Sequence, residues 1–164
     1  MADLDDIASV ESVCFPVLEA ATKEEFEQRI KYYGNHFWLM FDNDKLIAFV
    51  DGFVTDEANL TDEMYENASM HNENGAWQMI FGVNTLPEYR RCGYAKELIK
   101  KAILDAREQN RRGLVLTCKE SLVPYYSKFG FIDEGITDKS THGNVLWYQM
   151  RLDFELRNNG VKQI

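Results

Sequence analysis

The chain has 164 residues, of which 45% are hydrophobic and 13% aromatic, enough apolar surface to form the core of one compact domain. Its 27 acidic residues outnumber its 18 basic ones, giving a formal net charge of -9. This balance argues against general nucleic-acid binding, which needs a basic surface, and would suit a cationic small substrate.

The N-terminal segment and the cysteines bear on the compartment of the protein. The segment MADLDDIASVE is acidic and lacks the basic-then-apolar order of a signal peptide. No run of about eighteen apolar residues exists, so we expect a cytoplasmic protein without membrane attachment. Cys14, Cys92 and Cys118 are widely spaced and odd in number, which predicts reduced thiols without a disulfide or metal framework.

Two helices are predicted near the N-terminus. Residues 3–13 carry apolar side chains at a helical period, with acidic residues in the first turn, where the helix dipole favours them. Residues 14–17 interrupt this pattern. Thr22 then begins a second helix that runs to about Tyr32, with Glu25 three residues on in the capping-box arrangement.

A hairpin and a long polar loop are predicted next. Residues 36–41 and 45–55 are rich in β-forming side chains and flank Asp42-Asn43-Asp44, a hairpin signature. Residues 56–74 are polar and acidic, and we expect a mobile loop with one helical turn near residues 61–63. His71 lies in this loop, where a histidine is more often inert than catalytic.

The stretch QMIFGVNTLPEYRRCGYAKELIKK at residues 78–101 predicts a strand, a tight basic turn and a helix. The strand covers residues 79–85, and Pro87 ends it because proline lacks the N–H that a β-ladder needs. After the turn, apolar side chains recur on one helical face to near Asn110, at Leu98, Ile99, Ala102, Ile103 and Ala106.

The turn before this helix is predicted to bind an anion. The first N–H groups of a helix have no internal partner and lie at the positive end of its dipole, so phosphate is a suitable ligand. Gly93 allows close approach of a ligand to the backbone, and Arg90, Arg91 and Lys96 add positive charge to an otherwise acidic chain. The alternative is a solvated helix start whose cations only complement the acidic surface.

The last third of the chain completes a sheet. Residues 114–118 form a continuous apolar run typical of a buried parallel strand, reached by a right-handed crossover. Ser121 is predicted to cap a short helix through Phe129, with Gly130 in the left-handed conformation after it. Residues 131–136 and 145–152 follow as strands. We expect one domain over residues 1–154 and a polar, disordered C-terminal tail over 155–164.

Two motifs resemble hallmarks of the GNAT superfamily of N-acetyltransferases. Arg90-x-x-Gly93-x-Ala95, between a strand and a helix, is similar to the acetyl-CoA pyrophosphate loop of that superfamily. LVPYYSKFGF at residues 122–131 is similar to its second hallmark, and is closest to the arylalkylamine N-acetyltransferase branch. The resemblance covers residues 3 to about 154.

The resemblance implies a mixed α/β fold. Its central sheet would be mostly antiparallel and flanked by helices, with one splayed parallel pair formed by residues 79–85 and 114–118. Members usually have a strand before the first helix, and this sequence begins without one, so either that strand is absent or the start was trimmed, and we expect the sheet to lack one edge. Phe15 and Pro16, in the region that covers the amine pocket in this branch, are candidate pocket walls, although Phe15 can also be a plain core residue.

The resemblance also assigns an acetyl-CoA site. Backbone groups of Val83, Asn84 and Thr85 would contact the pantetheine arm and the acetyl carbonyl, where donors stabilise the developing oxyanion. The residues that would surround the pyrophosphate are Arg90, Arg91, Cys92, Gly93, Tyr94, Ala95 and Lys96.

The resemblance assigns the general acid of the reaction but leaves the general base open. Tyr126 matches the tyrosine that protonates the leaving thiolate, and Tyr125 is the adjacent alternative. The branch carries two histidines where this chain has Met79 and Phe81, neither of which accepts a proton. A water chain, Asp51, Glu120 or His71 remain candidates for the base.

These observations predict an acetyl-CoA-dependent N-acetyltransferase. Its acceptor would be a small primary amine, arylalkylamine or polyamine-like, acetylated by direct transfer in a ternary complex. The alternatives are a protein N-terminal or lysine acetyltransferase, and a non-catalytic acyl-CoA-binding regulatory module. Trp38, Tyr65 and Trp77 are candidate walls of an aromatic acceptor pocket, and a homodimer is a further expectation.

Overall fold

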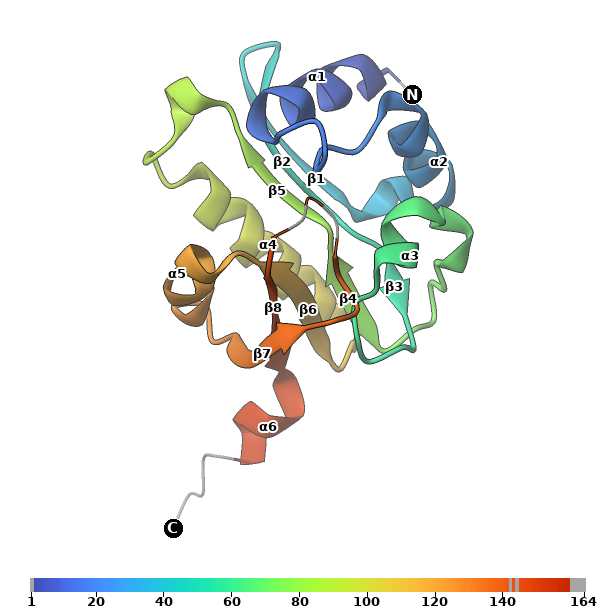
Figure 1. The fold of residues 1–164 in the computed structure, drawn as a ribbon, viewed down its shortest axis with the longest axis vertical. Coiled ribbons are helices and arrows are strands. Elements are labelled where there is room, and N and C mark those ends of the chain that lie inside the picture. The colour runs from blue at the N-terminus through green and yellow to red at the C-terminus, as the bar shows by residue number, and fades with distance from the viewer. Residues whose placement is uncertain (1, 142, 144, 160–164) are drawn as a thin grey trace.

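The computed structural model describes residues 2–141, 143 and 145–159, arranged as helices on both sides of two joined sheets (Figure 1). The helices are α1 (Leu4–Cys14), α2 (Lys23–Tyr33), α3 (Asp62–Glu66), α4 (Tyr94–Glu108), α5 (Val123–Ser127) and α6 (Phe154–Asn159). The strands are β1 (Phe37–Asp42), β2 (Lys45–Asp51), β3 (Val54–Thr55), β4 (Trp77–Ile80), β5 (Gly82–Thr85), β6 (Gly113–Cys118), β7 (Ile132–Thr137) and β8 (Trp147–Asp153).

The sheets run β1-β2-β5 and β3-β4-β6-β8-β7. Strands β4 and β6 are parallel, and every other described pairing is antiparallel, which confirms the predicted mixed sheet. β1 follows both N-terminal helices, so among the described residues it is the first strand of the chain.

Two predicted strands are each divided where the chain passes from one sheet to the other. The run 79–85 breaks at Phe81, so that β4 pairs with β6 while β5 pairs with β2. The run 45–55 breaks at Gly52 and Phe53. A Cβ at Gly52 would lie 1.7 Å from the carbonyl oxygen of Met79, so only glycine permits this approach of the two backbones. Because β4 pairs with β6 but β5 pairs with β2, the chain diverges from β6 after Phe81. This divergence is the splay that the resemblance implies.

The predicted 56–74 loop is anchored on the sheet rather than loosely attached. Leu60 and Met64 are fully buried in a second core cluster with Phe53, Trp77 and Val115. The expected helical turn is α3, which begins at Asp62. The acidic composition of the segment favoured a mobile loop, although Leu60 and Met64 are among its few apolar residues.

The N-terminal helix boundaries agree with the predictions to within one or two residues. Thr22 and Glu25 form the capping box: the backbone N–H of Glu25 donates to Thr22 Oγ1 at 3.2 Å, and that of Thr22 donates to Glu25 Oε2 at 2.6 Å. The large hydrophobic cluster lies between these helices, α4 and the sheets.

The predictions for the C-terminal third need two corrections. Ser121 is not a helix cap, since it lies inside a 3-10 turn and α5 begins at Val123 and ends at Ser127. Gly130 does have the predicted positive φ, of 100°. The predicted tail is helical from Phe154 to Asn159 because Asp153 Oδ1 accepts from the backbone N–H of Glu155, and residues 160–164 of that tail lie outside the described part.

None of the helices that the structure describes is both long and apolar enough to span a membrane.

Candidate active site

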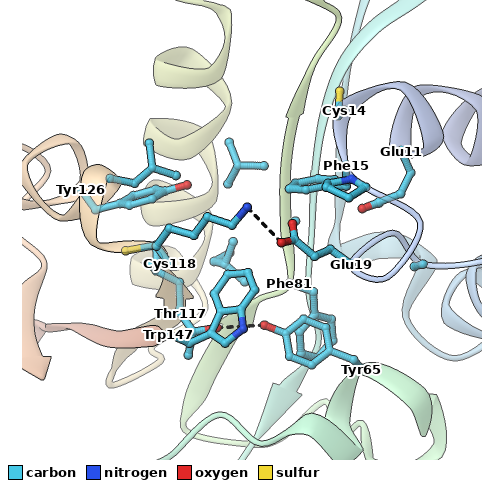
Figure 2. A pocket seen from close by; sticks show the side chains of 18 of the residues that line it. Glu11, Cys14, Phe15, Glu19, Tyr65, Phe81, Thr117, Cys118, Tyr126 and Trp147 are labelled. Carbon is cyan, nitrogen blue, oxygen red and sulfur yellow. Dashed lines mark hydrogen bonds and ion pairs between the residues drawn. The ribbon is translucent and has the colours of Figure 1, made fainter. Parts of the chain in front are cut away.

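A cavity of about 210 Å³ opens where β5 separates from β6 (Figure 2). Glu11, Phe15 and Pro16 line it from α1 and the residues that follow, and Phe81 to Val83 line it from the break between β4 and β5. Thr117, Cys118, Lys119 and Tyr126 close the opposite side. Four of the residues predicted for the site therefore meet in one cavity: Phe15, Pro16, Val83 and Tyr126.

The end of α1 is tied to the sheet at this cavity. Phe15 is the C-cap residue, with an extended backbone at φ −128° and ψ 147°, and Pro16 follows it. The Sγ of Cys14 donates to the carbonyl oxygen of Thr85 at 3.3 Å. Phe15 is half-buried and lines the cavity.

An ion pair joins the two sides of the cavity. Lys119, the residue after β6, has its Nζ 2.9 Å from Glu19 Oε1. The Glu19 side chain is only 5% exposed, whereas that of Lys119 is 43% exposed. Both residues of the pair line the cavity.

Tyr126 is the tyrosine of the Tyr125-Tyr126 pair that lines the cavity. Its ring is buried, its hydroxyl points into the cavity (Figure 2), and burial raises its pKa, so the phenol is protonated at neutral pH. Tyr125 packs against Phe129 instead, with ring centroids 5.4 Å apart. The two neighbours thus point in different directions, as the helical geometry predicts.

Four buried charged or polar side chains form what we call the carboxylate cluster: Glu11 and Arg29, which line the cavity, and Asp51 and Asn84 next to them. Arg29 Nη1 donates to Asp51 Oδ2 at 3.0 Å, and Arg29 Nη2 donates to the carbonyl oxygen of Tyr65 at 3.0 Å. Burial, and next the negative charge of Asp51, raise the pKa of Glu11 to about 8, against the opposing effect of Arg29.

Several atoms of the carboxylate cluster lack a hydrogen-bond partner among the described residues. They are Glu11 Oε2, Asp51 Oδ1, Arg29 Nε and both amide atoms of Asn84. Unpaired buried polar atoms are costly, and they concentrate at sites where a ligand completes the pairing. Sequence reasoning missed Glu11 and Arg29, although each is a charged residue on the buried face of an amphipathic helix, which was an available signal.

The turn before α4 contains two residues in the left-handed conformation. Arg91 and Gly93 have positive φ angles of 63° and 83°, and a Cβ at Gly93 would meet no described atom within 4 Å. The helical ladder begins with the N–H of Glu97 donating to the carbonyl of Gly93 at 3.1 Å. The N–H groups of Tyr94, Ala95 and Lys96 precede that ladder.

The remaining turn residues are solvent-facing or support the turn. Arg90, Arg91, Cys92 and Lys96 are exposed. Arg90 Nε donates to the carbonyl oxygen of Thr85 at 3.0 Å, which joins the turn to the end of β5. The positive charges therefore lie beside the free N–H groups of α4.

Strand β5 has one edge free of strand pairing in the described sheet, and it faces the cavity side. The N–H of Leu86 donates to Ile47 on β2, and backbone groups alternate in direction along a strand. Asn84 therefore directs its backbone groups to β2, whereas Val83 and Thr85 direct theirs to the free edge. The carbonyl of Thr85 already accepts from Cys14 and Arg90, which leaves Val83 best placed of the three predicted residues.

The candidates for the general base, and the two positions where the branch has histidines, lie in different surroundings. Met79 is fully buried, and Phe81 packs on Tyr65 with ring centroids 4.8 Å apart. Asp51 is fully buried in its ion pair with Arg29, and Glu120 is exposed. Trp38 and Trp77 pack elsewhere in the core, while Tyr65 and Trp147 line the cavity.

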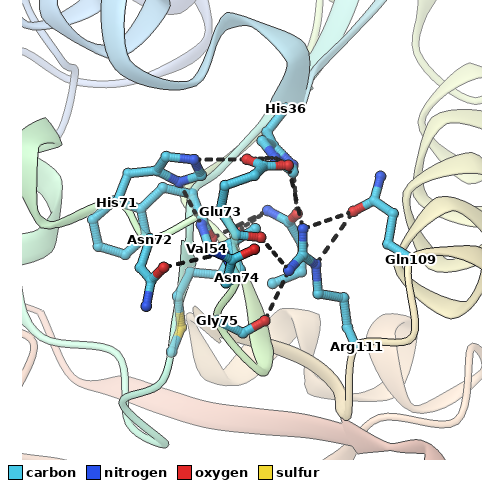
Figure 3. A network of polar contacts seen from close by, with 12 residues as sticks. His36, Val54, His71, Asn72, Glu73, Asn74, Gly75, Gln109 and Arg111 are labelled. Atoms are coloured by element: carbon cyan, nitrogen blue, oxygen red, sulfur yellow. Dashed lines mark hydrogen bonds and ion pairs between the residues drawn. The ribbon is translucent and has the colours of Figure 1, made fainter.

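His71 belongs to a second polar group, which we call the histidine network. Its members His36, His71, Glu73 and Arg111 are labelled in Figure 3, and Gln78 joins it through His36. Nε2 of each histidine lies 2.8 Å from Glu73 Oε2. His71 Nδ1 accepts from the N–H of Val54 at 3.1 Å, so Nε2 carries the proton and has no lone pair for a metal ion. Burial lowers the pKa of His71, in keeping with a neutral ring.

The other members complete the pairing in this network. The side-chain amide of Gln78 donates to Phe53 and Met79 carbonyls, so its oxygen must accept from His36 Nδ1 at 2.9 Å. Arg111 Nη1 donates to the carbonyls of Glu73 and Gly75 at 2.6 and 2.8 Å. The network joins the 56–76 segment to the sheet and contributes no residue to the cavity walls described above.

Comparison with known proteins decides the family. Residues 4–131 match the model described as the Acetyltransferase (GNAT) family. This chain belongs to the GNAT acetyltransferase family. A curated relative, serotonin N-acetyltransferase from Mesocricetus auratus, is 30% identical over 93 residues, which are 56% of this chain. The match spans 43% of that relative, less than half its length.

Solved structures share the fold of this GNAT chain. The loading GNATL domain of CurA from Lyngbya majuscula has a TM-score of 0.81 at 16% identity, covering 95% of both chains. The ribosomal-protein-S18-alanine N-acetyltransferase from Escherichia coli has a TM-score of 0.67 at 16% identity, covering 93% of this chain and 88% of that one. A Brucella melitensis GNAT acetyltransferase in complex with acetyl-CoA has a TM-score of 0.59 at 16% identity, covering 93% and 82%.

Proposed function

We propose that this GNAT chain is an acetyl-CoA-dependent N-acetyltransferase that acetylates a small primary amine, arylalkylamine or polyamine-like, by direct transfer in a ternary complex. One observation carries the proposal. The hydroxyl of Tyr126 and the Glu11–Phe15 wall face each other across a single cavity, which opens at the free edge of β5.

The residues present fit acetyl-CoA. The N–H groups of Tyr94 to Lys96, with Arg91 beside them, would hold the pyrophosphate, and the open space at Gly93 admits its oxygens. The backbone of Val83 would hold the pantetheine arm along the free edge of β5. Acetyl-CoA supplies an activated acetyl group, and the protein positions it against the amine.

Tyr126 would act as the general acid of the transfer. Its phenol is protonated at neutral pH and points into the cavity from α5, so it would donate to the sulfur as that atom gains negative charge. Phe131 packs against its ring, with centroids 6.2 Å apart, and so fixes its direction.

The acceptor side of the cavity suits an amine with an aromatic or alkyl group. Phe15, Tyr65, Phe81 and Trp147 provide aromatic surface, and the carboxyl group of Glu11 lines the cavity beside the buried Arg29–Asp51 ion pair. Aromatic faces and carboxylates both attract cations. The similarity to serotonin N-acetyltransferase, whose name specifies an arylalkylamine acceptor, supports this choice.

A panel assay that measures free CoA release tests the proposal. The acceptors are 2-phenylethylamine, spermidine, a short peptide with a free N-terminus, and an N-terminally blocked peptide containing lysine. We expect turnover with 2-phenylethylamine or spermidine to exceed that with either peptide. Preference for a peptide would make the chain a protein acetyltransferase. Acetyl-CoA binding without turnover of any acceptor would make it a non-catalytic binding module.

A further inference from the structure

We infer that Glu11 is the proton acceptor for the substrate ammonium, and that the carboxylate cluster around Gly82 is the ammonium-binding end of the pocket. This inference rests on the proposed function, because it assigns a role within the same transfer. Glu11 was not among the residues that the sequence singled out.

The first support is the convergence of polar atoms beside Gly82, a residue that lines the cavity. A Cβ built on Gly82 would lie 3.0 Å from Asn84 Nδ2, 3.1 Å from Asp51 Oδ1 and 3.9 Å from Glu11 Oε1. Gly82 lines the cavity, so the absence of a side chain at this position leaves a polar recess there.

The second support is that buried polar atoms of this recess lack hydrogen-bond partners among the described residues. Glu11 is 5% exposed, Asp51 is fully buried and Asn84 is 1% exposed. Glu11 Oε2, Asp51 Oδ1 and Asn84 Oδ1 are acceptors without a donor in the part of the chain that the structure describes. A primary ammonium carries three N–H donors, and the unpaired carboxylate oxygens of Glu11 and Asp51 are acceptors for them.

The third support is charge. Arg29 balances Asp51 through a 3.0 Å ion pair, so Glu11 decides whether the recess is neutral or negative. An arriving ammonium favours the ionised form of Glu11, because opposite charges at short distance stabilise each other. The charged and titratable groups that act on Glu11 are Asp51 on β2, Arg29 and Glu25 on α2, and Cys14 on its own helix.

The transfer then balances as follows. The ammonium gives one proton to the Glu11 carboxylate, and the freed lone pair forms a bond to the acetyl carbon. The carbon–sulfur bond breaks, and Tyr126 protonates the departing sulfur. The second nitrogen proton restores the Tyr126 hydroxyl, and Glu11 later releases its proton to solvent. The products are the amide, free CoA and one proton.

The test uses Glu11→Gln, with Asp6→Asn as the matched control on the exposed face of the same helix. We expect Glu11→Gln to lower kcat/KM for 2-phenylethylamine at least tenfold at pH 8, and Asp6→Asn to leave it unchanged. Acetyl-CoA titration calorimetry counts the folded sites in each preparation. Because glutamine keeps the volume and removes only the ionisable group, the variant should fold.

Two readouts separate proton transfer from packing. In the wild type, kcat/KM should rise with pH and level off above about 8, whereas in Glu11→Gln it should keep rising toward the amine pKa of about 10.4. The loss should also shrink for β,β-difluoro-2-phenylethylamine, because fluorine acidifies its ammonium and more of it arrives neutral.

The outcomes distinguish this inference from the proposed function. A wild type that turns over no amine refutes the proposed function itself. An active wild type whose rate and pH profile Glu11→Gln leaves unchanged overturns the role of Glu11 alone. An equal loss for both amines, with an unaltered pH profile, would also overturn it, because it would show that Glu11 only shapes the pocket.

Discussion

The histidine network and the carboxylate cluster both place charged side chains against the sheet, yet they differ in how their polar atoms are paired. In the histidine network, both nitrogens of His36 and of His71 meet a partner, and Arg111 donates to two carbonyls. In the carboxylate cluster, Glu11, Asp51 and Asn84 each hold an unpaired buried atom. A completed network stabilises the fold, whereas an incomplete one beside a cavity indicates a ligand site.

The surroundings of the two groups agree with this difference. Glu73 contacts both histidines of the histidine network, and its side chain is 50% exposed, so water reaches the carboxylate. Burial tends to raise the pKa of Glu73, but hydrogen bonds from His36 and His71 outweigh it and hold that pKa below its usual value. For Glu11 the pKa moves the opposite way, because burial and Asp51 dominate. One carboxylate is held ionised, and the other is poised to change its charge.

The largest expected effect concerns the cavity side. Tyr126→Phe should lower kcat by about 100-fold while acetyl-CoA affinity changes little, because the lost hydroxyl acts only as the sulfur gains charge. Tyr125→Phe is the matched control and should do far less, since that ring packs on Phe129. Steady-state kinetics with calorimetry of acetyl-CoA binding measure both. Equal, small effects would make both tyrosines packing residues.

The next effect concerns the histidine network. Glu73→Gln should lower the free energy of unfolding by about 2 kcal/mol at pH 7, because it removes the charged acceptor of two buried imidazoles. The rate per folded molecule should stay unchanged, since the network contributes no residue to the cavity walls. Denaturant unfolding of this variant and of Glu57→Gln, an exposed carboxylate of the same segment, provides the comparison. A large loss of kcat in folded Glu73→Gln would break the separation of the two groups.

A substitution in the turn before α4 should weaken acetyl-CoA binding and leave the histidine network and the carboxylate cluster unchanged. Arg91→Glu or Gly93→Asp should weaken acetyl-CoA binding at least tenfold, about 1.4 kcal/mol, because each brings negative charge to the free N–H groups of the helix. Titration calorimetry measures the affinity. Unchanged acetyl-CoA affinity in both variants would show that this turn does not bind the pyrophosphate.

The smallest expected effect is on how stability changes with pH. Ionisation of Glu11 lowers the stability of the fold, whereas ionisation of Glu73 raises it. The folded pKa of Glu11 lies above its unfolded value of 4.5, so wild-type stability falls as pH rises between 4.5 and about 8. Glu11→Gln removes that loss and should be more stable than the wild type by roughly 1 kcal/mol at pH 8. The folded pKa of Glu73 is lowered, so its contribution is present above pH 4.5 and is lost as pH falls. Melting temperatures across pH that change in the same direction for both variants would contradict this.

Local patterns in the sequence were sufficient to predict most of the fold. The capping box at Thr22, the turn at Asn43 and the helix after Gly93 depend on neighbouring residues, and the structure has all three. The divisions at Gly52 and Phe81 depend on two backbones meeting across the sheet. A continuous run of β-forming residues cannot reveal such a meeting, although glycines at 52 and 82 were a partial signal.

The site was predictable only where a motif is contiguous. Tyr126 and the turn at residues 90–96 belong to short motifs, whereas the carboxylate cluster joins residues from α1, α2, β2 and β5. No spacing in the sequence brings Glu11 to Gly82. What the sequence did offer was a charged residue at a position where the apolar period of the first helix predicts burial.

The most direct test of the account is a crystal structure with a bisubstrate compound in which CoA is joined through an acetyl linker to 2-phenylethylamine. We expect the pyrophosphate on the N–H groups of Tyr94 to Lys96, the sulfur beside the Tyr126 hydroxyl, and the amine nitrogen in the recess formed by Glu11, Asp51 and Gly82. An acceptor end that lies outside this cavity, with Glu11 and Tyr126 both remote from the linker, would contradict it.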